Sequence, residues 1–417
     1  MRDIHYVKNH MEKNIIKNNL ILIISFSSFF FFWDYSILNI QLRFLILLPL
    51  IAILFSNYFV IQVFNIKSII FLIIFFHLLL NVNKNFNFFY FASFFFLFFI
   101  SIIIMIYKGY ILDNFEKFTY FFIVLLILSI IFYVFANYQM IDSYYVGNFF
   151  QLSKLIFKEN SHLGMVVPSV IIFFIYRYSI KKNYHYLAII LILLCLIFLS
   201  YSLTAFAGLI LSCTVLIITN YSIIKKQLIY LIILVILSSL QIFTNNQIYS
   251  KFANSINTIN DFKSEIILSD EKKISDKKNI VPNLSIEVYL TSLKIAFYSL
   301  KDKPFGYGLN NYQSAFNEYI GKIYTRKKET QQLNLQDGSN NFSKIVTEFG
   351  FFSILFLFFA YKFIFSKKID LSYKFLIVPN LITQTFIRGA GYFNGGYIVF
   401  LLLLIFLVYE KELKTNN

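Results

Sequence analysis

The residues best suited to chemistry lie late in the chain, where its one long polar interval gives way to apolar runs. Glu348 stands at the mouth of such a run, and an ionisable side chain at a membrane mouth is by default a candidate functional group. Arg388 is followed by glycines at positions 389, 391, 395 and 396, which permit close approach of the backbone. A carboxylate can accept a proton, and a guanidinium fork can pair with two oxygens of an anion. These residue types could support proton transfer beside a stabilised negative charge.

Other polar residues widen the choice of proton acceptor. The run 304–308, Pro-Phe-Gly-Tyr-Gly, predicts a fixed turn that brings backbone close to a bound group. Asp337 is an alternative acceptor to Glu348, although an Asp-Gly pair is more often simply a turn. His162 is a third candidate, although a lone histidine is more often a structural group.

The composition decides which elements must position these residues. Of 417 residues, 58% are hydrophobic and only 14% are charged, whereas in soluble proteins about half are apolar and about a quarter charged. The apolar runs are roughly 16 to 22 residues long, enough to cross a ~30 Å hydrocarbon layer as helices. They lack the alternation of a lipid-exposed barrel strand. We therefore predict an all-α, polytopic transmembrane helical bundle.

The apolar runs and the basic clusters between them give a topology. Under an even count of spans, the strong basic clusters outside the long polar loop fall on one side, which the positive-inside rule assigns to the cytoplasm together with both termini. The loops 137–162 and 245–341 and Arg388 then lie on the outer face. We expect about twelve spans, at 20–37, 42–57, 64–82, 88–107, 118–136, 163–176, 185–201, 203–220, 228–244, from about 342, at 371–387 and at 395–409.

This pattern predicts four parts of the chain. They are the amino-terminal spans 1–136, the central spans 137–244 with a medium periplasmic loop, the large periplasmic loop 245–341, and the carboxyl-terminal spans 342–417. Residues 245–282 are rich in Lys, Asp, Ser and Asn and are typical of a solvated segment. From Ile286 the loop predicts an amphipathic helix that Pro304 ends. Its apolar stripe is Ile286, Leu290, Leu293, Phe297 and Leu300, and its opposite, solvated stripe is Glu287, Thr291, Lys294 and Lys301.

Composition also excludes several classes of function. The formal net charge of +16 comes from short lysine clusters between spans, so we expect no nucleic-acid partner. Cys195 and Cys213 both fall inside predicted spans, which argues against disulfides and a zinc site. There is no phosphate-cradling glycine loop followed by lysine and no acidic pair at a metal-holding spacing. We expect no cofactor and no metal.

Several short motifs together resemble a known family. They are the run 304–308, the run 339–342 (Ser-Asn-Asn-Phe), the run 348–350 (Glu-Phe-Gly), and the earlier runs 159–164 and 200–205. With one large outer loop late in a multi-span chain, they are similar to the O-antigen polymerase and ligase superfamily. The resemblance covers roughly 137 to 417. Where ligases of the family usually have histidine, this chain has Ser339, which favours a polymerase.

The resemblance implies transfer of a glycan from an undecaprenyl-pyrophosphate donor to a sugar hydroxyl, on the outer side of a bacterial inner membrane. Arg388 would then stabilise the leaving pyrophosphate. Glu348 would be the general base, with Asp337 or His162 as alternatives. The candidate substrate-binding residues are the cations Arg326, Lys294, Lys301 and Lys303 and the sugar-binding side chains Tyr307, Asn310, Ser339 and Asn340.

Two rival functions stay open. A ligase would use the same donor with lipid A core as acceptor. A transporter or lipid-glycan flippase would need charged residues buried in the middle of spans, and the predicted spans are almost free of them. Expected partners are the lipid-linked glycan, membrane lipid and, as a candidate, a protein that regulates chain length.

Overall fold

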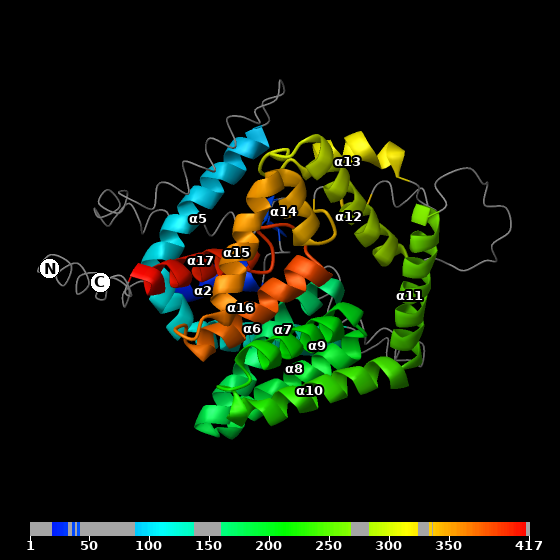
Figure 1. The fold of residues 1–417 in the computed structure, drawn as a ribbon. Helices are drawn as coiled ribbons and strands as arrows, with labels where there is room; N and C mark the ends of the chain where they lie inside the picture. Colours follow the sequence, from blue (N-terminus) through cyan, green and yellow to red (C-terminus); the bar gives the residue numbers. More distant parts are fainter. Residues whose placement is uncertain are drawn as a thin grey trace, which may run out of the picture.

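The described part of the protein is almost entirely helical. The computed structural model describes residues 19–31, 36–37, 40–41, 88–136, 160–267, 283–323, 333–335 and 337–413. Apart from a short hairpin of β1 (Ser36–Ile37) and β2 (Ile40–Gln41), its regular elements are helices (Figure 1). The all-α prediction is therefore confirmed for this part of the chain.

Five of the described helical segments are long and apolar enough to cross a membrane. They are Phe96–Asp113, Ser161–Lys181, Leu203–Asn220, Lys225–Thr244 and Asn341–Phe365. Shorter apolar helices occupy Ile21–Phe30, Tyr184–Ser200 and Tyr397–Glu410. The protein is thus a multi-pass helical membrane protein. The predicted spans 42–57 and 64–82 lie outside the described residues, and the count of twelve stays a prediction.

The central helices begin and end close to their predicted bounds. The amino-terminal half contributes α2 (Asn19–Phe30), α5 (Phe88–Asp113) and α6 (Phe115–Ala136). The following helices are α7 (Asn160–Lys181), α8 (Tyr184–Ser200), α9 (Leu203–Asn220) and α10 (Lys225–Thr244). Side-chain caps explain two of the starts, because Asn183 accepts from the His185 N–H and Ser202 from the Ala205 N–H.

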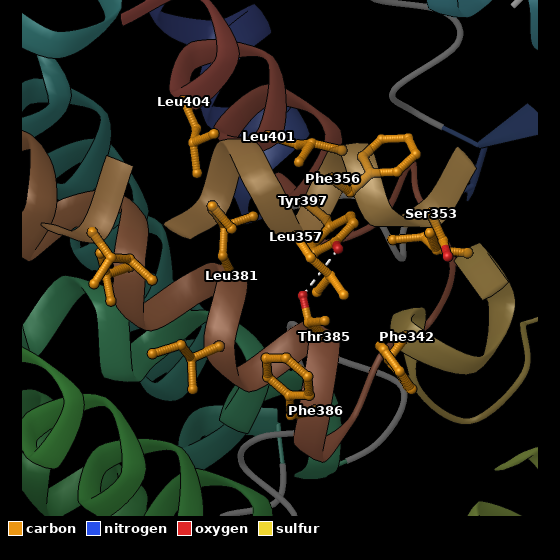
Figure 2. A pocket seen from close by; sticks show the side chains of 15 residues that line it. Phe342, Ser353, Phe356, Leu357, Leu381, Thr385, Phe386, Tyr397, Leu401 and Leu404 are labelled. Carbon is orange, nitrogen blue, oxygen red and sulfur yellow. Dashed lines mark hydrogen bonds between the residues drawn. The ribbon is translucent and has the colours of Figure 1, made fainter. Parts of the chain in front are cut away.

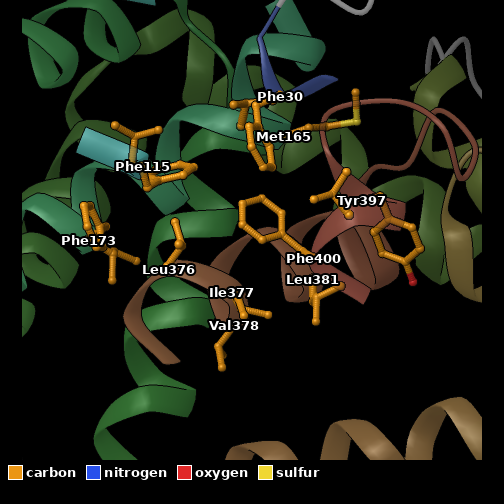
Figure 3. Packing of buried hydrophobic residues seen from close by; sticks show 14 of the residues in the cluster. Phe30, Phe115, Met165, Phe173, Leu376, Ile377, Val378, Leu381, Tyr397 and Phe400 are labelled. Atoms are coloured by element: carbon orange, nitrogen blue, oxygen red, sulfur yellow. The ribbon is translucent and has the colours of Figure 1, made fainter. Parts of the chain in front are cut away.

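α7 is the centre of the bundle. It is apolar on all sides and packs against α8, α9, α10 and α16 (Leu371–Ile382), and 83% of its candidate span is buried. Aromatic rings fill the neighbouring core: Phe115 lies edge-on to Phe173 at 5.3 Å between centroids, and Phe30 lies 4.9 Å from Phe400 (Figure 3). The phenylalanines near position 30 therefore pack inside the bundle.

The start of the long loop is helical. Residues 246–267, expected to be part of a solvated segment, form helix α11 (Asn246–Ile267), which packs against α9, α10 and α12. Asn283 joins α11 to the next helix, because its side chain donates to Ser255 Oγ at 2.8 Å and accepts from the Ser285 N–H. The segment is thus helical and contacts the bundle, while most of its described side chains are exposed, in agreement with a solvated segment.

The predicted amphipathic helix is present as α12 (Leu284–Asp302), but its buried face is the opposite one. Glu287 and Thr291, assigned to the solvated face, are 4% and 1% exposed, whereas Phe297 on the apolar stripe is 66% exposed. The buried face carries Thr291, Ser292, Ala296 and Ser299, and such small side chains let α12 approach α14 (Asn341–Phe349) closely. On the apolar stripe Phe297 is exposed and the other residues are half-buried, which fits a helix that lies in a membrane interface: Ile286, Leu290, Leu293 and Leu300.

The carboxyl-terminal helices contain two interruptions. α14 continues through a 3-10 turn at Gly350–Phe352 into α15 (Ser353–Phe365), so the predicted tenth span is broken near its outer end. α16 passes into a π-helical turn, η7 (Thr383–Ile387), and a loop with left-handed glycines then leads to α17 (Tyr397–Leu413). The short α13 (Tyr312–Tyr319), ending in a 3-10 turn at Ile320–Lys322, packs with α12 and α14 (Figure 1). π-helical turns are frequent at functional sites.

Candidate functional site

Two motifs that are nearly fifty residues apart meet at the end of η7. The Gly389 N–H donates to the Ser339 carbonyl at 2.9 Å, and Arg388 Nη1 donates to the same carbonyl at 3.4 Å. Ser339 adopts a left-handed conformation with φ of 56°, which turns this carbonyl toward the arginine. Arg388 and the Ser339–Asn340 pair, separate candidates in the sequence, therefore belong to one site.

The approach is close because residue 389 is glycine. A Cβ atom there would lie 2.6 Å from Asn341 Oδ1 and 2.7 Å from the Asn341 backbone nitrogen, too near for any other residue. Asn341 is fully buried, and neither end of its side-chain amide has a hydrogen-bond partner. The loop after η7 thus covers the first turn of α14.

Asn340 links the start of α14 to α12. It caps α14, since its Oδ1 accepts from the Ser343 N–H at 2.8 Å, while its Nδ2 donates to Ser292 Oγ on α12 at 3.2 Å. Ser292 and Ser343 also contact each other at 3.2 Å between hydroxyl oxygens. A bound sugar would have to compete with these bonds, so the cap accounts for Asn340 without a ligand.

Glu348 holds the glycine turn against α14. Its carboxylate accepts from the Asn310 N–H at 2.8 Å and from the Tyr312 N–H at 3.1 Å, and the residue is fully buried. Gly308 donates to the Glu348 carbonyl at 2.9 Å, and Phe351 donates to the Pro304 carbonyl at 2.8 Å. In this arrangement Glu348 is placed to position the chain, and the general-base role predicted for it stays untested.

The glycines of the two motifs interlock. Gly306 and Gly350 both have positive φ, and a Cβ on Gly306 would overlap the Glu348 carbonyl while one on Gly350 would overlap the Pro304 carbonyl. The run 304–308 and the run 348–350 are therefore two halves of one backbone contact. It holds the turn 304–308 against the end of α14.

Lys344 was missed by the sequence reasoning. It is 2% exposed, its Nζ lies 3.8 Å from Glu348 Oε1, and it sits 5.2 Å from the centroid of the Tyr392 ring. A signal was present, because a lysine four residues before a glutamate falls inside the run predicted as the tenth span. Lys344 thus places a buried positive charge in the first turn of α14, five residues after Ser339.

Tyr307, in the turn 304–308, belongs to a separate polar cluster that includes Glu318 of α13. Its hydroxyl donates to Glu318 Oε2 at 2.7 Å, and Lys303 Nζ reaches the same carboxylate at 3.1 Å and lies 3.9 Å from the Tyr307 ring centroid. Burial raises the pKa of Tyr307, and its hydrogen bonds to Tyr319 and Glu318 add to this. Partial burial raises the pKa of Glu318, but the bonds from Tyr307 and Lys303 outweigh it and the net pKa is lowered.

The other predicted residues are not gathered with Arg388 by any described contact. Lys294 is half-buried on α12, and Lys301 is exposed in its last turn. His162 is 8% exposed at the outer end of α7, where Gly164 packs against the start of α9. Asn310 contributes its backbone N–H to Glu348. Arg326 lies outside the described residues.

An apolar groove runs along the bundle beside the arginine contact. It is formed by α14, α15, α16, η7 and α17, with Phe342 and Phe386 near its outer end and Ile364 and Val378 among its other lining residues (Figure 2). The Thr385 and Tyr397 hydroxyls in its wall bond to each other at 2.9 Å. Leu357 and Phe386 are 43% and 44% exposed, so the groove opens at the surface of the bundle. Its lining suits an apolar chain.

Comparison with known proteins agrees with this arrangement. Residues 187–358 match the family model described as O-Antigen ligase, a segment that covers less than half of the chain and contains the interlocked glycine motifs, Lys344 and Glu348 but not Arg388. No curated protein and no solved structure matches the chain. Residues 187–358 are thus similar to the O-antigen ligase family, which supports the resemblance of the chain to the O-antigen polymerase and ligase superfamily of membrane enzymes.

Proposed function

We propose that this protein is a membrane glycosyltransferase that polymerises undecaprenyl-pyrophosphate-linked repeat units of O-antigen or a related surface polysaccharide. It works on the periplasmic face of the bacterial inner membrane, with both termini in the cytoplasm. The observation that carries the proposal is the position of Arg388, which contacts the start of α14 beside the outer end of an apolar groove.

The donor of such a reaction is amphiphilic, and the two parts of the site suit its two parts. The guanidinium fork of Arg388 can pair with pyrophosphate oxygens and stabilise the charge that develops as the pyrophosphate leaves. The groove between α15, α16 and α17 offers an apolar wall for the polyprenyl chain. Phe342 and Phe386, whose rings lie 5.8 Å apart, mark the end of the groove nearest the arginine.

The residue at position 339 favours a polymerase over a ligase. Residue 339 is a serine where ligases of the family usually have a histidine, and its carbonyl is engaged by Arg388 and Gly389. A ligase is the second candidate, because the matching family model is described as an O-antigen ligase. A flippase is less favoured, since Glu348 and Asn340 at the site are packed into fixed contacts.

A deletion strain separates the candidates. If the protein is a polymerase, its loss leaves single repeat units on the lipid A core, and gel electrophoresis shows one band in place of a ladder. If it is a ligase, its loss leaves long chains on undecaprenyl pyrophosphate and none on the core. A flippase would leave repeat units trapped on the cytoplasmic leaflet. Purified protein in nanodiscs should lengthen lipid-linked repeat units without any other enzyme.

A large side chain placed in the groove tests whether the groove binds the polyprenyl chain. Ala360 lines the groove on α15, whereas Ile354 on the same helix is 59% exposed and does not line it. Ala360→Trp should raise the KM for the lipid-linked donor about tenfold or more, because a large side chain displaces the apolar tail. Ile354→Trp should leave the KM unchanged. An unchanged KM in Ala360→Trp would place the tail elsewhere.

A further inference from the structure

The Asp337 carboxylate and the buried Lys344 ammonium group both lie beside the slot that is open because residue 391 is glycine. A Cβ atom on Gly391 would lie 3.0 Å from Asp337 Oδ1 and 3.7 Å from Lys344 Nζ, and the glycine has φ of 89°. Both charged groups are therefore within 4 Å of one point beside the loop that begins with Arg388. The slot exists because residue 391 has no side chain.

Of the three proton acceptors considered, Asp337 has the most suitable surroundings. Glu348 is fully buried and already accepts two backbone N–H bonds and faces Lys344. His162 is buried on α7 at 8% exposure. Asp337 is half-buried, lies two residues from the Ser339 carbonyl that binds Arg388, and is carried on a turn whose Gly338 packs against the Tyr312 ring.

We propose that Asp337 is the general base of the glycosyl transfer and that Lys344 is the positioning residue that holds it. The inference rests on the proposed function. Lys344 Nζ lies 3.8 Å from Glu348 Oε1, and Lys344 Nζ and Asp337 Oδ1 both lie within 4 Å of the position that a Cβ on Gly391 would take. A buried cation this close to the space beside Asp337 attracts its carboxylate and favours one orientation of it.

The step balances with groups already named. Asp337 takes the proton from the acceptor sugar hydroxyl as the hydroxyl oxygen forms a bond to the anomeric carbon of the donor. The bond from that carbon to the pyrophosphate oxygen breaks, and the pyrophosphate leaves with the electron pair, paired with Arg388. The products are the lengthened glycan, the lipid pyrophosphate and a protonated Asp337, which then releases its proton to water.

The elements packed around Asp337 supply few other ionisable groups. α14 supplies Lys344 and Glu348, the loop after η7 supplies Arg388 and Tyr392, and α13 supplies Tyr312. Burial raises the pKa of Tyr392 and of Tyr312, so both phenols stay protonated and uncharged. Of these groups Lys344 and Arg388 are cations and Glu348 is a carboxylate.

The experiment measures polymerisation by purified protein in nanodiscs, with lipid-linked repeat units as donor and acceptor. Asp337→Asn should lower kcat at least a hundredfold, because a positioned base contributes about 10² to 10⁴, while the KM for the donor stays within twofold. Gly391→Ala should lower kcat as well, because its Cβ would displace the carboxylate. The matched control is Gly321→Ala, where a Cβ meets nothing within 4 Å, and its rate should not change.

Lys344 needs a variant that keeps the protein folded. Lys344→Met alone leaves Glu348 buried without its cation, so the double variant Lys344→Met/Glu348→Gln removes both charges of the pair together. It should keep the melting temperature near that of Glu348→Gln while kcat falls at least tenfold below that variant at constant KM. Lys344→Arg in the wild-type background keeps the cation, so its kcat should lie above that of the double variant Lys344→Met/Glu348→Gln.

The outcomes distinguish the two levels of the proposal. If the wild-type protein does not lengthen lipid-linked repeats, the proposed function fails. If it does and Asp337→Asn keeps more than a third of the wild-type kcat, Asp337 is not the base. If the double variant matches Glu348→Gln in rate, Lys344 is structural only and its positioning role is overturned.

Discussion

At the scale of single residues, the site gathers charged side chains from the turn before α14, from α14 itself and from the loop after η7. Arg388 reaches Ser339, Lys344 reaches Glu348, and Asp337 and Lys344 face the same slot at Gly391. Each cation lies near the first turns of α14. Cations at this place can hold an anionic leaving group or orient a carboxylate, and these are the two tasks that the proposed transfer requires.

Arg388 can be separated from a generic positive charge. Arg388→Ala should abolish polymer, a loss of at least a hundredfold in kcat, because the fork that pairs with pyrophosphate is removed. Arg388→Lys should recover only a small part of the rate, since a lysine cannot pair with two oxygens at once. Glycan length on gels and protein level in membranes are the measurements. Normal chain length in Arg388→Ala at normal protein level would remove Arg388 from the mechanism.

The Glu318 cluster predicts a dependence of stability on acid. The pKa of Glu318 is lowered from 4.5 by its bonds to Tyr307 and Lys303, despite a partial desolvation that acts in the opposite direction. A lowered pKa means that the folded state is stabilised above the unfolded pKa and loses this stabilisation as pH falls through the folded pKa. Glu318→Gln should therefore melt below the wild type at pH 7, and the difference should shrink as the pH falls below about 4.3. Equal melting temperatures at pH 7 would contradict this.

At the scale of elements, the outer loop is fastened to the membrane bundle by backbone and not by a large apolar core. Gly306 and Gly350 interlock, Glu348 caps the turn at Asn310, and Asn340 ties α14 to α12. A small aromatic core holds α13 against α12, with Tyr312, Phe316 and Tyr319 at its centre. The helices at the site are thus positioned by close contacts that tolerate no added atoms.

The interlock predicts which glycines are structural. Gly350→Ala places a Cβ on the Pro304 carbonyl and strains a residue with φ of 54°, so it should cost about 1–3 kcal/mol or more and lower the melting temperature by several degrees. Gly109→Ala is the matched control, because a Cβ there meets nothing within 4 Å. Thermal unfolding of the two variants in the same detergent checks the difference. Similar melting temperatures would show that the two turns are not locked together.

At the scale of the whole molecule, the proposed reaction needs the site and the lipid-linked donor on the same side of the membrane. Ser339 is 3% exposed, which makes it a poor position for a label, but Lys301 is exposed at the end of α12. In a Cys195→Ala/Cys213→Ala background, Lys301→Cys should react with a membrane-impermeant maleimide in intact spheroplasts. Lys226→Cys, an exposed position in the first turn of α10, should react only after lysis. The reverse pattern would leave the proposed enzyme without its donor.

The sequence by itself determined the class of the molecule and most of its described helix bounds. Long apolar runs without alternation can only be membrane helices, and caps and a proline fix where several of them begin and end, as at Ser202 before α9 and Pro304 after α12. It also located the two motifs that the structure interlocks. Arg388, Ser339 and Glu348 were all found as candidates before their contacts were known.

Only the tertiary structure decided which faces are buried and which charges meet. In a membrane protein apolar side chains are stable against lipid as well as against protein, so hydrophobicity cannot tell the outward face of a helix from its packed face. α12 was therefore assigned the wrong buried face, and its small polar residues are what pack against α14. Lys344 was overlooked for a different reason. Its place beside Tyr392 and the Gly391 slot depends on contacts between separate segments, and the sequence does not show which segments are neighbours in space.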